Sequence, residues 1–262
     1  MPVNILFIGD IIGKPGRQAV SRELHRLVDR YNADIVIANG ENASGGFGIT
    51  VESAKELFSA GVHCITSGNH IWDKRDIYEY LKSEERIIRP ANYPEGAPGK
   101  GSSVVQTPGG VNVGVINVEG RIFMNNLDCP FKAADREIAA LSERTKIIVL
   151  DFHAEATSEK SALGWYLDGR VSFVTGTHTH VQTADERIFP EGTAYISDAG
   201  MTGAFDSVIG MKKEEPINKF ITQLPGKFEV AKKNVRLNGV VVSVDELSGK
   251  AISINRINIS CE

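Results

Sequence analysis

The sequence predicts an α/β fold built on mixed β-sheets, and three observations lead to this prediction. Short apolar runs such as residues 4–8 and 34–38 are each followed by Gly or Asn, as expected for strands buried on both faces of a sheet. Segments with apolar residues three and four positions apart separate these runs and predict covering helices. Turn signals at residues 108–110 and 247–249 predict hairpins, which add antiparallel pairs to an otherwise parallel scheme.

The first part of the chain alternates strands and helices. The periodicity predicts strands at residues 4–8, 34–38 and 62–66, and helices at residues 17–30 and 51–60. Asp73 is expected to cap a helix that runs to Leu81, and the Pro- and Gly-rich residues 89–101 are expected to form a loop.

The second part adds the hairpins. In order, we expect strands at 103–107 and 111–117, a helix at 131–143, a strand at 146–152, a helix at 158–167, and strands at 171–174, 193–196, 234–244 and 251–259. These elements form either two packed mixed sheets with helices outside or one large mixed sheet. No linker or repeat interrupts the 262 residues, so a single domain over residues 1–262 is expected.

Composition excludes some classes of function. A formal net charge of −4 gives no general attraction for nucleic acid or for an anionic membrane surface. The three cysteines have no paired spacing, which is typical of reduced thiols in a cytoplasmic protein. No apolar stretch is long enough to span a bilayer, so cytoplasmic residence is expected.

Metal-ligating residue types follow five of the predicted strands. Because ligands bind outside the carboxyl ends of strands in open α/β sheets, these side chains are expected to share one site. The candidates are Asp10, Glu41, Asn42, Asn69, His70, His153, His178 and His180. If residues 177–180 are extended, His178 and His180 project from the same side of the chain and reach one small site.

The donor types favour two ions. Carboxylate and amide oxygens with imidazole nitrogens suit Mn, Fe or Zn, whereas no cysteine is placed to select a soft metal. So many ligands exceed the needs of one ion, but they suit two ions about 3.5–4 Å apart that share a carboxylate. Such a pair can clamp an in-line displacement at phosphorus and lower the pKa of a bound water to give hydroxide at neutral pH.

Each candidate also has an ordinary structural alternative. Asp10 could be a helix N-cap, Asn42 and Asn69 could be left-handed turn residues, and His153 could be a hydrogen-bonded core histidine. A site is favoured because these alternatives would all have to hold together at five successive strand ends.

Five segments resemble, in order and context, the motif series of the calcineurin-like metallophosphoesterases: Gly9-Asp10, Gly40-Glu41-Asn42, Gly68-Asn69-His70, His153 and Gly176-Thr177-His178-Thr179-His180. The resemblance is closer still to the YmdB-like branch of bacterial cyclic-nucleotide phosphodiesterases, and it extends over nearly the whole chain. It implies a four-layer α/β/β/α sandwich of two mixed β-sheets flanked by helices, the metallo-dependent phosphatase fold.

The resemblance also implies roles for the candidates. One ion would take Asp10, Glu41, Asn42 and His180, and the other Glu41, Asn69, His153 and His178. His70 is then free to act as general acid towards the leaving alkoxide. Fe or Mn is expected at both positions, with Zn or Mg as alternatives.

Three departures from the wider superfamily are visible. Ile12 stands where that pattern has His, and Glu41 stands where it has Asp, so we expect Asn42 to supply the missing ligand with an oxygen. Ile71 rather than an acidic residue follows His70, so His70 is expected to lack the usual carboxylate partner.

Two glycine-rich segments are candidates for substrate contact. Phe47 lies in residues 45–48, and Phe205 and Ser207 lie in residues 200–211, which are too long for a simple connection. Phe205 could stack on a base, and an oligomer contact is the equal alternative for both segments.

The predicted function is hydrolysis of small phosphodiesters, 2′,3′-cyclic nucleotides such as 2′,3′-cAMP above all, by attack of a metal-bridging hydroxide. The alternatives are a regulatory protein that binds metal and nucleotide with little turnover, and a phosphomonoesterase or protein phosphatase. The resemblance also implies a homo-oligomer, either a dimer or a tetramer.

Overall fold

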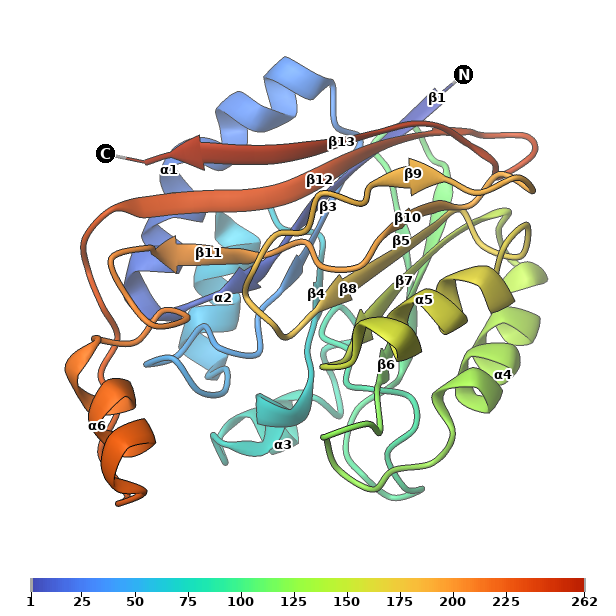
Figure 1. The fold of residues 1–262 in the computed structure, drawn as a ribbon. Coiled ribbons are helices and arrows are strands. Elements are labelled where there is room, and N and C mark those ends of the chain that lie inside the picture. Colours follow the sequence, from blue (N-terminus) through green and yellow to red (C-terminus); the bar gives the residue numbers. More distant parts are fainter. Residues whose placement is uncertain (1, 262) are drawn as a thin grey trace.

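Four layers make up the molecule, in the order helices, sheet, sheet, helices (Figure 1). The computed structural model describes residues 2–261, so the end residues of the predicted range 1–262, Met1 and Glu262, lie outside the described residues. The predicted sandwich of two mixed sheets is confirmed, and the single large sheet left open by the periodicity is excluded.

The first sheet has seven strands and brings together distant parts of the chain. Its order is β2 (Asp10–Ile11), β11 (Met201–Ala204), β12 (Val235–Asp245), β1 (Pro2–Ile8), β3 (Ile35–Asn39) and β4 (Cys64–Thr66), with β13 (Ala251–Ser260) also paired to β12. Strands β1, β3 and β4 are parallel, whereas β12 runs antiparallel to β1.

The second sheet has six strands. Its order is β5 (Ser102–Gln106), β6 (Asn112–Glu119), β7 (Ile147–His153), β8 (Phe173–Thr177), β10 (Ala194–Ile196) and β9 (Arg187–Ile188). The four central strands are parallel, and the edge strands β5 and β9 pair antiparallel. Parallel central strands place their carboxyl ends together at one rim.

Helices cover both outer faces. Helices α1 (Gly13–Tyr31) and α2 (Val51–Ser59) cover the first sheet, and α4 (Pro130–Ser142) and α5 (Thr157–Tyr166) cover the second (Figure 1). Among residues 2–261, no helix has the length and apolar character needed to cross a membrane.

Side-chain alternation explains the three cores. In β1, Leu6 and Ile8 pack in the cluster under α1 and α2, whereas Ile5 and Phe7 pack in the cluster between the sheets. Phe7 meets Phe173 of the second sheet edge to face, with ring centroids 6.4 Å apart. Because neighbouring residues of a strand face opposite ways, a continuous apolar run supplies both cores at once.

The helix predicted from Asp73 to Leu81 is much shorter than expected. A 3₁₀ turn occupies Asn69–Trp72, and α3 covers only Ile77–Tyr80. The Asp73 carboxylate contacts the His70 ring instead of capping a helix, and Asp76 accepts a hydrogen bond from the backbone of Val51. Both aspartates are therefore used elsewhere.

Residues 200–222 are more ordered than the sequence indicated. The expected long loop contains β11, which fills the gap between β2 and β12, and α6 (Glu214–Thr222) follows it. Figure 1 shows α6 at the periphery, away from the four layers.

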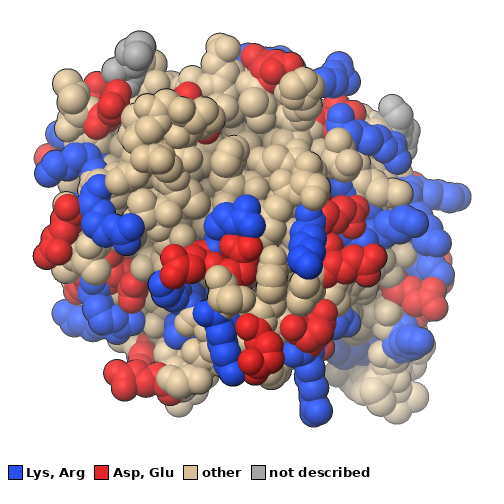
Figure 2. All heavy atoms as spheres, turned by 180° about the vertical axis from the view of Figure 1, so that it is seen from behind, with Lys and Arg blue, Asp and Glu red and all other residues tan. Residues whose placement is uncertain are grey.

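On the face opposite to that view, acidic and basic side chains are intermixed (Figure 2).

Candidate metal centre

The candidate residues converge where the carboxyl ends of the two sheets meet. Asp10 begins β2, Glu41 and Asn42 follow β3, Asn69 and His70 lie in the 3₁₀ turn after β4, His153 ends β7, and His178 and His180 follow β8. Strand ends of both sheets therefore contribute to one rim.

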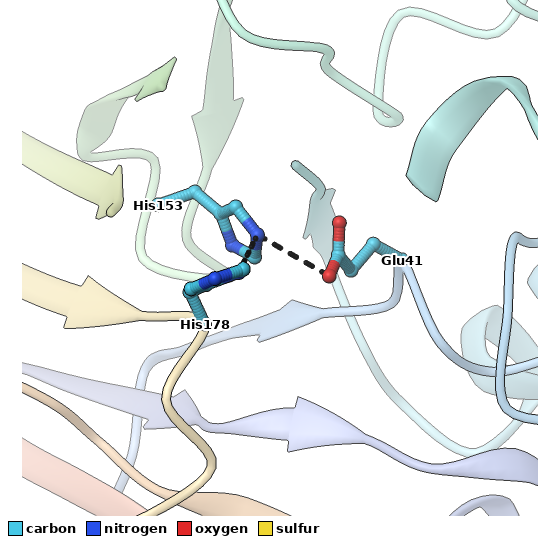
Figure 3. A group of neighbouring side chains, drawn as sticks. All are labelled: Glu41, His153 and His178. Atoms are coloured by element: carbon cyan, nitrogen blue, oxygen red, sulfur yellow. Dashed lines mark hydrogen bonds and ion pairs between the residues drawn. The ribbon is translucent and has the colours of Figure 1, made fainter. Parts of the chain in front are cut away.

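One group of donor atoms surrounds His153 Nε2. This atom lies 3.2 Å from Glu41 Oε1, 3.1 Å from His178 Nδ1 and 3.0 Å from Asn69 Oδ1. Figure 3 shows the side chains of Glu41, His153 and His178 pointing towards one another. Atoms bound about 2.1 Å from a common ion are separated by roughly 3.0–3.4 Å, so the group fits one metal ion.

A second group lies beside the first. Asp10 Oδ1 and Asn42 Oδ1 are buried and have no hydrogen-bond partner within residues 2–261. His180 Nε2 lies 3.9 Å from Asp10 Oδ1, and the Asn42 amide nitrogen lies 3.2 Å from the same imidazole atom. Buried oxygens without a donor are costly, and a cation satisfies them.

Glu41 connects the two groups. Its Oε1 accepts a hydrogen bond from Asn42 at 3.0 Å and lies against His153, while its Oε2 accepts the backbone N–H of His70 at 3.0 Å. A carboxylate between two sets of donor atoms is placed to bridge two ions.

Hydrogen bonds prepare the imidazoles as ligands. His153 Nδ1 pairs with Thr177 Oγ1 at 2.9 Å, and Thr177 donates onward to buried Asp151 at 2.7 Å. His180 Nδ1 lies 2.9 Å from the carbonyl oxygen of Ile209, to which it can donate. With the proton on Nδ1, each ring presents a free Nε2 lone pair to the site.

The His178 imidazole is reversed relative to the other two. Its Nδ1 faces the His153 group, and its Nε2 lies 3.2 Å from the Glu155 carboxylate. Burial and the neighbouring His153 charge lower the pKa of His178 to about 3, and burial lowers the pKa of His180. Both rings are therefore neutral at pH 7, as metal ligands must be.

Negative charge accumulates beneath the site. The fully buried carboxylates are Asp10, Glu41, Glu119, Asp151 and Asp198, against the single buried ammonium of Lys160 within the described residues. Burial raises the pKa of Asp10, and burial raises the pKa of both Glu119 and Asp151 to about 6. Cations held at this rim would compensate for carboxylates whose ionisation is disfavoured by burial.

The His153–Glu41 pair carries the opposite shifts. Burial disfavours the charged forms of both groups, but their mutual attraction prevails, so the pKa of His153 rises to about 9 and that of Glu41 falls to about 2. The two side chains therefore form a buried ion pair within the first group of donor atoms.

The backbone that carries His178 and His180 is not extended, which corrects the sequence-based expectation. His178 has φ 100° and His180 has φ 64°, conformations that non-glycine residues rarely adopt. The two side chains reach the site through these turns and not through strand periodicity.

A buried ion pair holds this turn. Asp198 Oδ2 accepts hydrogen bonds from the Thr179 backbone N–H at 3.1 Å and the Thr179 hydroxyl at 2.8 Å. Lys160 donates to Asp198 at 2.7 Å and to the carbonyl oxygen of Thr177 at 2.9 Å. Asp198 follows a predicted strand, which could have indicated its place, but Lys160 in a predicted helix gave no signal.

His70 lies outside both groups of donor atoms and is partly exposed. Its Nδ1 lies 2.9 Å from Asp73 Oδ2, so the expectation that it lacks a carboxylate partner is wrong. The 3₁₀ turn explains the difference, because it places residues three positions apart on one side, beyond Ile71.

A pocket of about 560 Å³ opens over the donor atoms. Phe47 and His70 line it, with ring centroids 5.1 Å apart. Phe205 and Ser207 do not line it: the Phe205 ring lies under the Arg236 guanidinium, and Ser207 donates to the carbonyl oxygen of Ala204. These contacts hold the segment after β11 and leave neither side chain in the pocket lining.

Comparisons with known proteins agree with this architecture. A 2′,3′-cyclic-nucleotide 2′-phosphodiesterase of Bacillus subtilis (strain 168) is 50% identical over 258 residues, which are 98% of this chain and 97% of that protein. A solved structure from Thermus thermophilus has a TM-score of 0.92 and 43% identity, covering 98% of this chain and 99% of the other.

A second solved structure, a phosphatase from Mycoplasma pneumoniae, has a TM-score of 0.92 and 36% identity, covering 99% of this chain and 94% of the other. A family model described as YmdB-like protein matches residues 6–257. The chain therefore belongs to the YmdB-like protein family.

Proposed function

We propose that this protein is a phosphodiesterase that binds two divalent metal ions and hydrolyses small phosphodiesters, 2′,3′-cyclic nucleotides such as 2′,3′-cAMP in particular. The observation that carries the proposal is the pair of donor groups sharing Glu41, with orphaned oxygens on Asp10 and Asn42. The activity of the Bacillus subtilis relative, 50% identical over the full chain, supports the substrate class.

The chain's residues divide into two ligand sets. Asp10, Glu41, Asn42 and His180 would hold one ion, and Glu41, Asn69, His153 and His178 the other. When bound, the two ions supply Lewis-acid stabilisation of the phosphoryl oxygens and lower the pKa of water. Only His180 contributes nitrogen to the first set, which favours Fe or Mn, with Zn or Mg as alternatives.

His70 is proposed to deliver the proton to the leaving oxygen. Its Nδ1 is paired with Asp73, which leaves Nε2 to carry the transferred proton. As water oxygen bonds to phosphorus, the bond from phosphorus to the 2′-oxygen breaks, and the proton of His70 passes to that oxygen. The product is then a nucleoside 3′-phosphate with a free 2′-hydroxyl.

We further propose that the chain forms a homo-oligomer, dimer or tetramer, as one metallophosphoesterase domain in the cytoplasm. Strand β13 supports this assembly, because it pairs only with β12 among the described strands and exposes Ile252 on a sheet edge. The three free cysteines suit a reducing compartment.

Metal content combined with an activity assay tests the proposal. Protein purified without chelator is analysed for metals, and 2′,3′-cAMP hydrolysis is measured before and after EDTA, in the wild type and in Glu41→Gln. We expect two metals per chain, EDTA-sensitive turnover restored by Mn, and loss of turnover in the variant.

Other outcomes identify the alternatives. Two metals without turnover would indicate a regulatory binding protein. Because a structural relative is described as a phosphatase, faster cleavage of p-nitrophenyl phosphate than of bis-p-nitrophenyl phosphate would indicate a monoesterase. Unchanged turnover in Glu41→Gln would reject the metal mechanism.

A further inference from the structure

The pocket over the donor atoms has two chemically different halves. One half carries the metal-ligand candidates Glu41, Asn42, His178 and His180 together with His70. The other is formed mainly by apolar side chains from two segments, Phe47 in the loop after β3 and a group from residues 208–228: Val208, Ile209, Met211, Pro216, Phe220 and Phe228.

We propose that this apolar half is the binding site for the nucleobase of the substrate, with Phe47, Phe220 and Phe228 as the stacking residues. The inference rests on the proposed phosphodiesterase function and adds the residues that recognise the part of the substrate away from phosphorus. A volume of about 560 Å³ is within the range of small-molecule sites.

Aromatic rings extend in sequence from His70, next to the donor atoms, into the apolar half of the pocket. The Phe47 ring lies 5.1 Å from the His70 ring and 6.4 Å from the Phe228 ring, centroid to centroid. A ligand whose phosphorus lies at the donor atoms therefore places its remaining bulk between His70 and these phenyl rings. Flat heteroaromatic bases stack on such rings whatever the identity of the base.

Helix α6 offers an apolar surface that the described fold does not use. Only Pro216 of this helix is buried, while Phe220 is 76% exposed, although it lines the pocket. An exposed phenyl ring next to a reaction centre is expected where a ligand covers it during the reaction.

Two polar side chains lie among the apolar ones. Lys219 Nζ lies 5.3 Å from the centroid of the Phe228 ring, within the range of a cation–π interaction. Gln223 ends α6 with φ 60°, and its amide donates to the carbonyl oxygen of Phe220 at 3.1 Å. This bond leaves the side-chain oxygen of Gln223, Oε1, to accept a hydrogen bond from the edge of a base.

Two substrates with the same reacting group separate base binding from catalysis. Glycerol 1,2-cyclic phosphate has the five-membered cyclic phosphodiester of 2′,3′-cAMP but no base. In Phe228→Ala and Phe220→Ala, we expect kcat/KM for 2′,3′-cAMP to fall about 10- to 100-fold, mainly through KM. The value for the glycerol substrate is expected to change much less, because that substrate does not reach the rings.

Ile221→Ala is the matched control. Ile221 lies on the same helix and is 78% exposed, but it does not line the pocket. Its replacement is expected to leave both substrates unchanged. Equal losses on both substrates in the phenylalanine variants, or a loss in Ile221→Ala accompanied by a change in sedimentation, would overturn the proposal and identify α6 as an interface between copies.

A binding measurement keeps this inference separate from the proposed reaction. In EDTA-treated protein, 2-aminopurine riboside 3′-phosphate is titrated, and stacking is expected to quench its fluorescence in the wild type and less in Phe228→Ala. If neither substrate is hydrolysed but quenching depends on Phe228, the proposed function fails and the base site stands. If both are hydrolysed and quenching is unaffected by Phe228→Ala, the base site fails alone.

Discussion

Lys160 and Asp198 illustrate how one buried ion pair can set the geometry of a metal site. Asp198 binds Thr179, which lies between His178 and His180, and Lys160 binds both Asp198 and the carbonyl oxygen of Thr177. The pair thus anchors the residues on either side of His178, in a turn where His178 and His180 both have positive φ.

Replacing Lys160 with Met should both destabilise the protein and weaken metal binding. Asp198 would be left buried and unpaired, at a cost of about 3–5 kcal/mol in unfolding free energy. The loss of ligand orientation should raise the metal Kd about 10- to 100-fold. Chemical denaturation and Mn titration measure the two effects.

Lys132→Met is the control for this variant, because the Lys132 side chain is 78% exposed. It should change neither quantity. A Lys160→Met variant with the metal affinity of the wild type would show that the ion pair does not position the ligands.

His70→Gln tests the proposed proton transfer through the leaving group. General acids contribute about 10²–10⁴-fold when the leaving oxygen is an alkoxide. Turnover of 2′,3′-cAMP should fall by that factor, whereas bis-p-nitrophenyl phosphate, whose phenolate leaves without a proton, should be affected far less. A similar loss on both substrates would instead assign His70 to metal or phosphate binding.

Single residues differ in how far the sequence could place them. Asp10 and His153 were predictable, because Asp10 lies two residues after one apolar strand and His153 ends another, and the carboxyl ends of these strands must lie at the rim. Lys160 was not, because a lysine in an amphipathic helix is usually solvated, and only the packing of α5 on β8 and β10 brings it to Asp198.

At the scale of elements, the turn between β4 and the 3₁₀ helix controls the site. Gly68 has φ −165°, an extended conformation open to any residue, but a Cβ there would lie 2.2 Å from the His153 ring. The requirement for glycine is thus steric and comes from a strand in the other sheet.

Gly68→Ala should therefore displace His153 and lower metal occupancy, with a loss of about 1–3 kcal/mol of stability from overpacking. Metal analysis and thermal unfolding give the two readouts. Gly226→Ala, where a Cβ meets nothing within 4 Å, is the control and should be neutral. Full metal occupancy in Gly68→Ala would contradict the steric argument.

Elements with long, regular apolar patterns were predictable, and irregular ones were not. The strands of both sheet centres and helices α1, α2, α4 and α5 follow from local periodicity. Strand β11 was missed because its four residues, Met-Thr-Gly-Ala, have no strand pattern, and α6 was missed because it has only nine residues and contains Pro216, a residue that usually interrupts a helix.

At the scale of the molecule, metal-free protein should lose stability as the pH rises. The pKa of His153 increases from 6.5 to about 9 on folding, so the folded state binds more protons than the unfolded state between these values. The contribution of His153 to the free energy of unfolding, about 3 kcal/mol, is fully present below pH 6.5 and is lost as the pH rises through 9. The lowered pKa of His178 makes the free energy of unfolding depend on pH only below pH 6.5, outside this range.

Thermal unfolding in EDTA between pH 7 and 9 measures this effect, and the midpoint should fall across the range. The Mn-loaded protein should show little of this dependence, because a metal on Nε2 excludes the proton. A midpoint in EDTA that is level or rises from pH 7 to 9 would show that His153 is not protonated in the metal-free fold.

Strand β12 has a consequence for the order in which the protein is made. It pairs with β1 along the full length of that strand, from Pro2 with Asp245 to Ile8 with Gly239, so the first and last parts of the chain share a ladder. During synthesis, β1 therefore keeps one edge unpaired until β12 has left the ribosome. Asp10 begins β2, two residues beyond the end of β1, and pairs with Met201 of β11. The ligand set that contains Asp10 is therefore expected to be complete only after the C-terminal strands have joined this sheet.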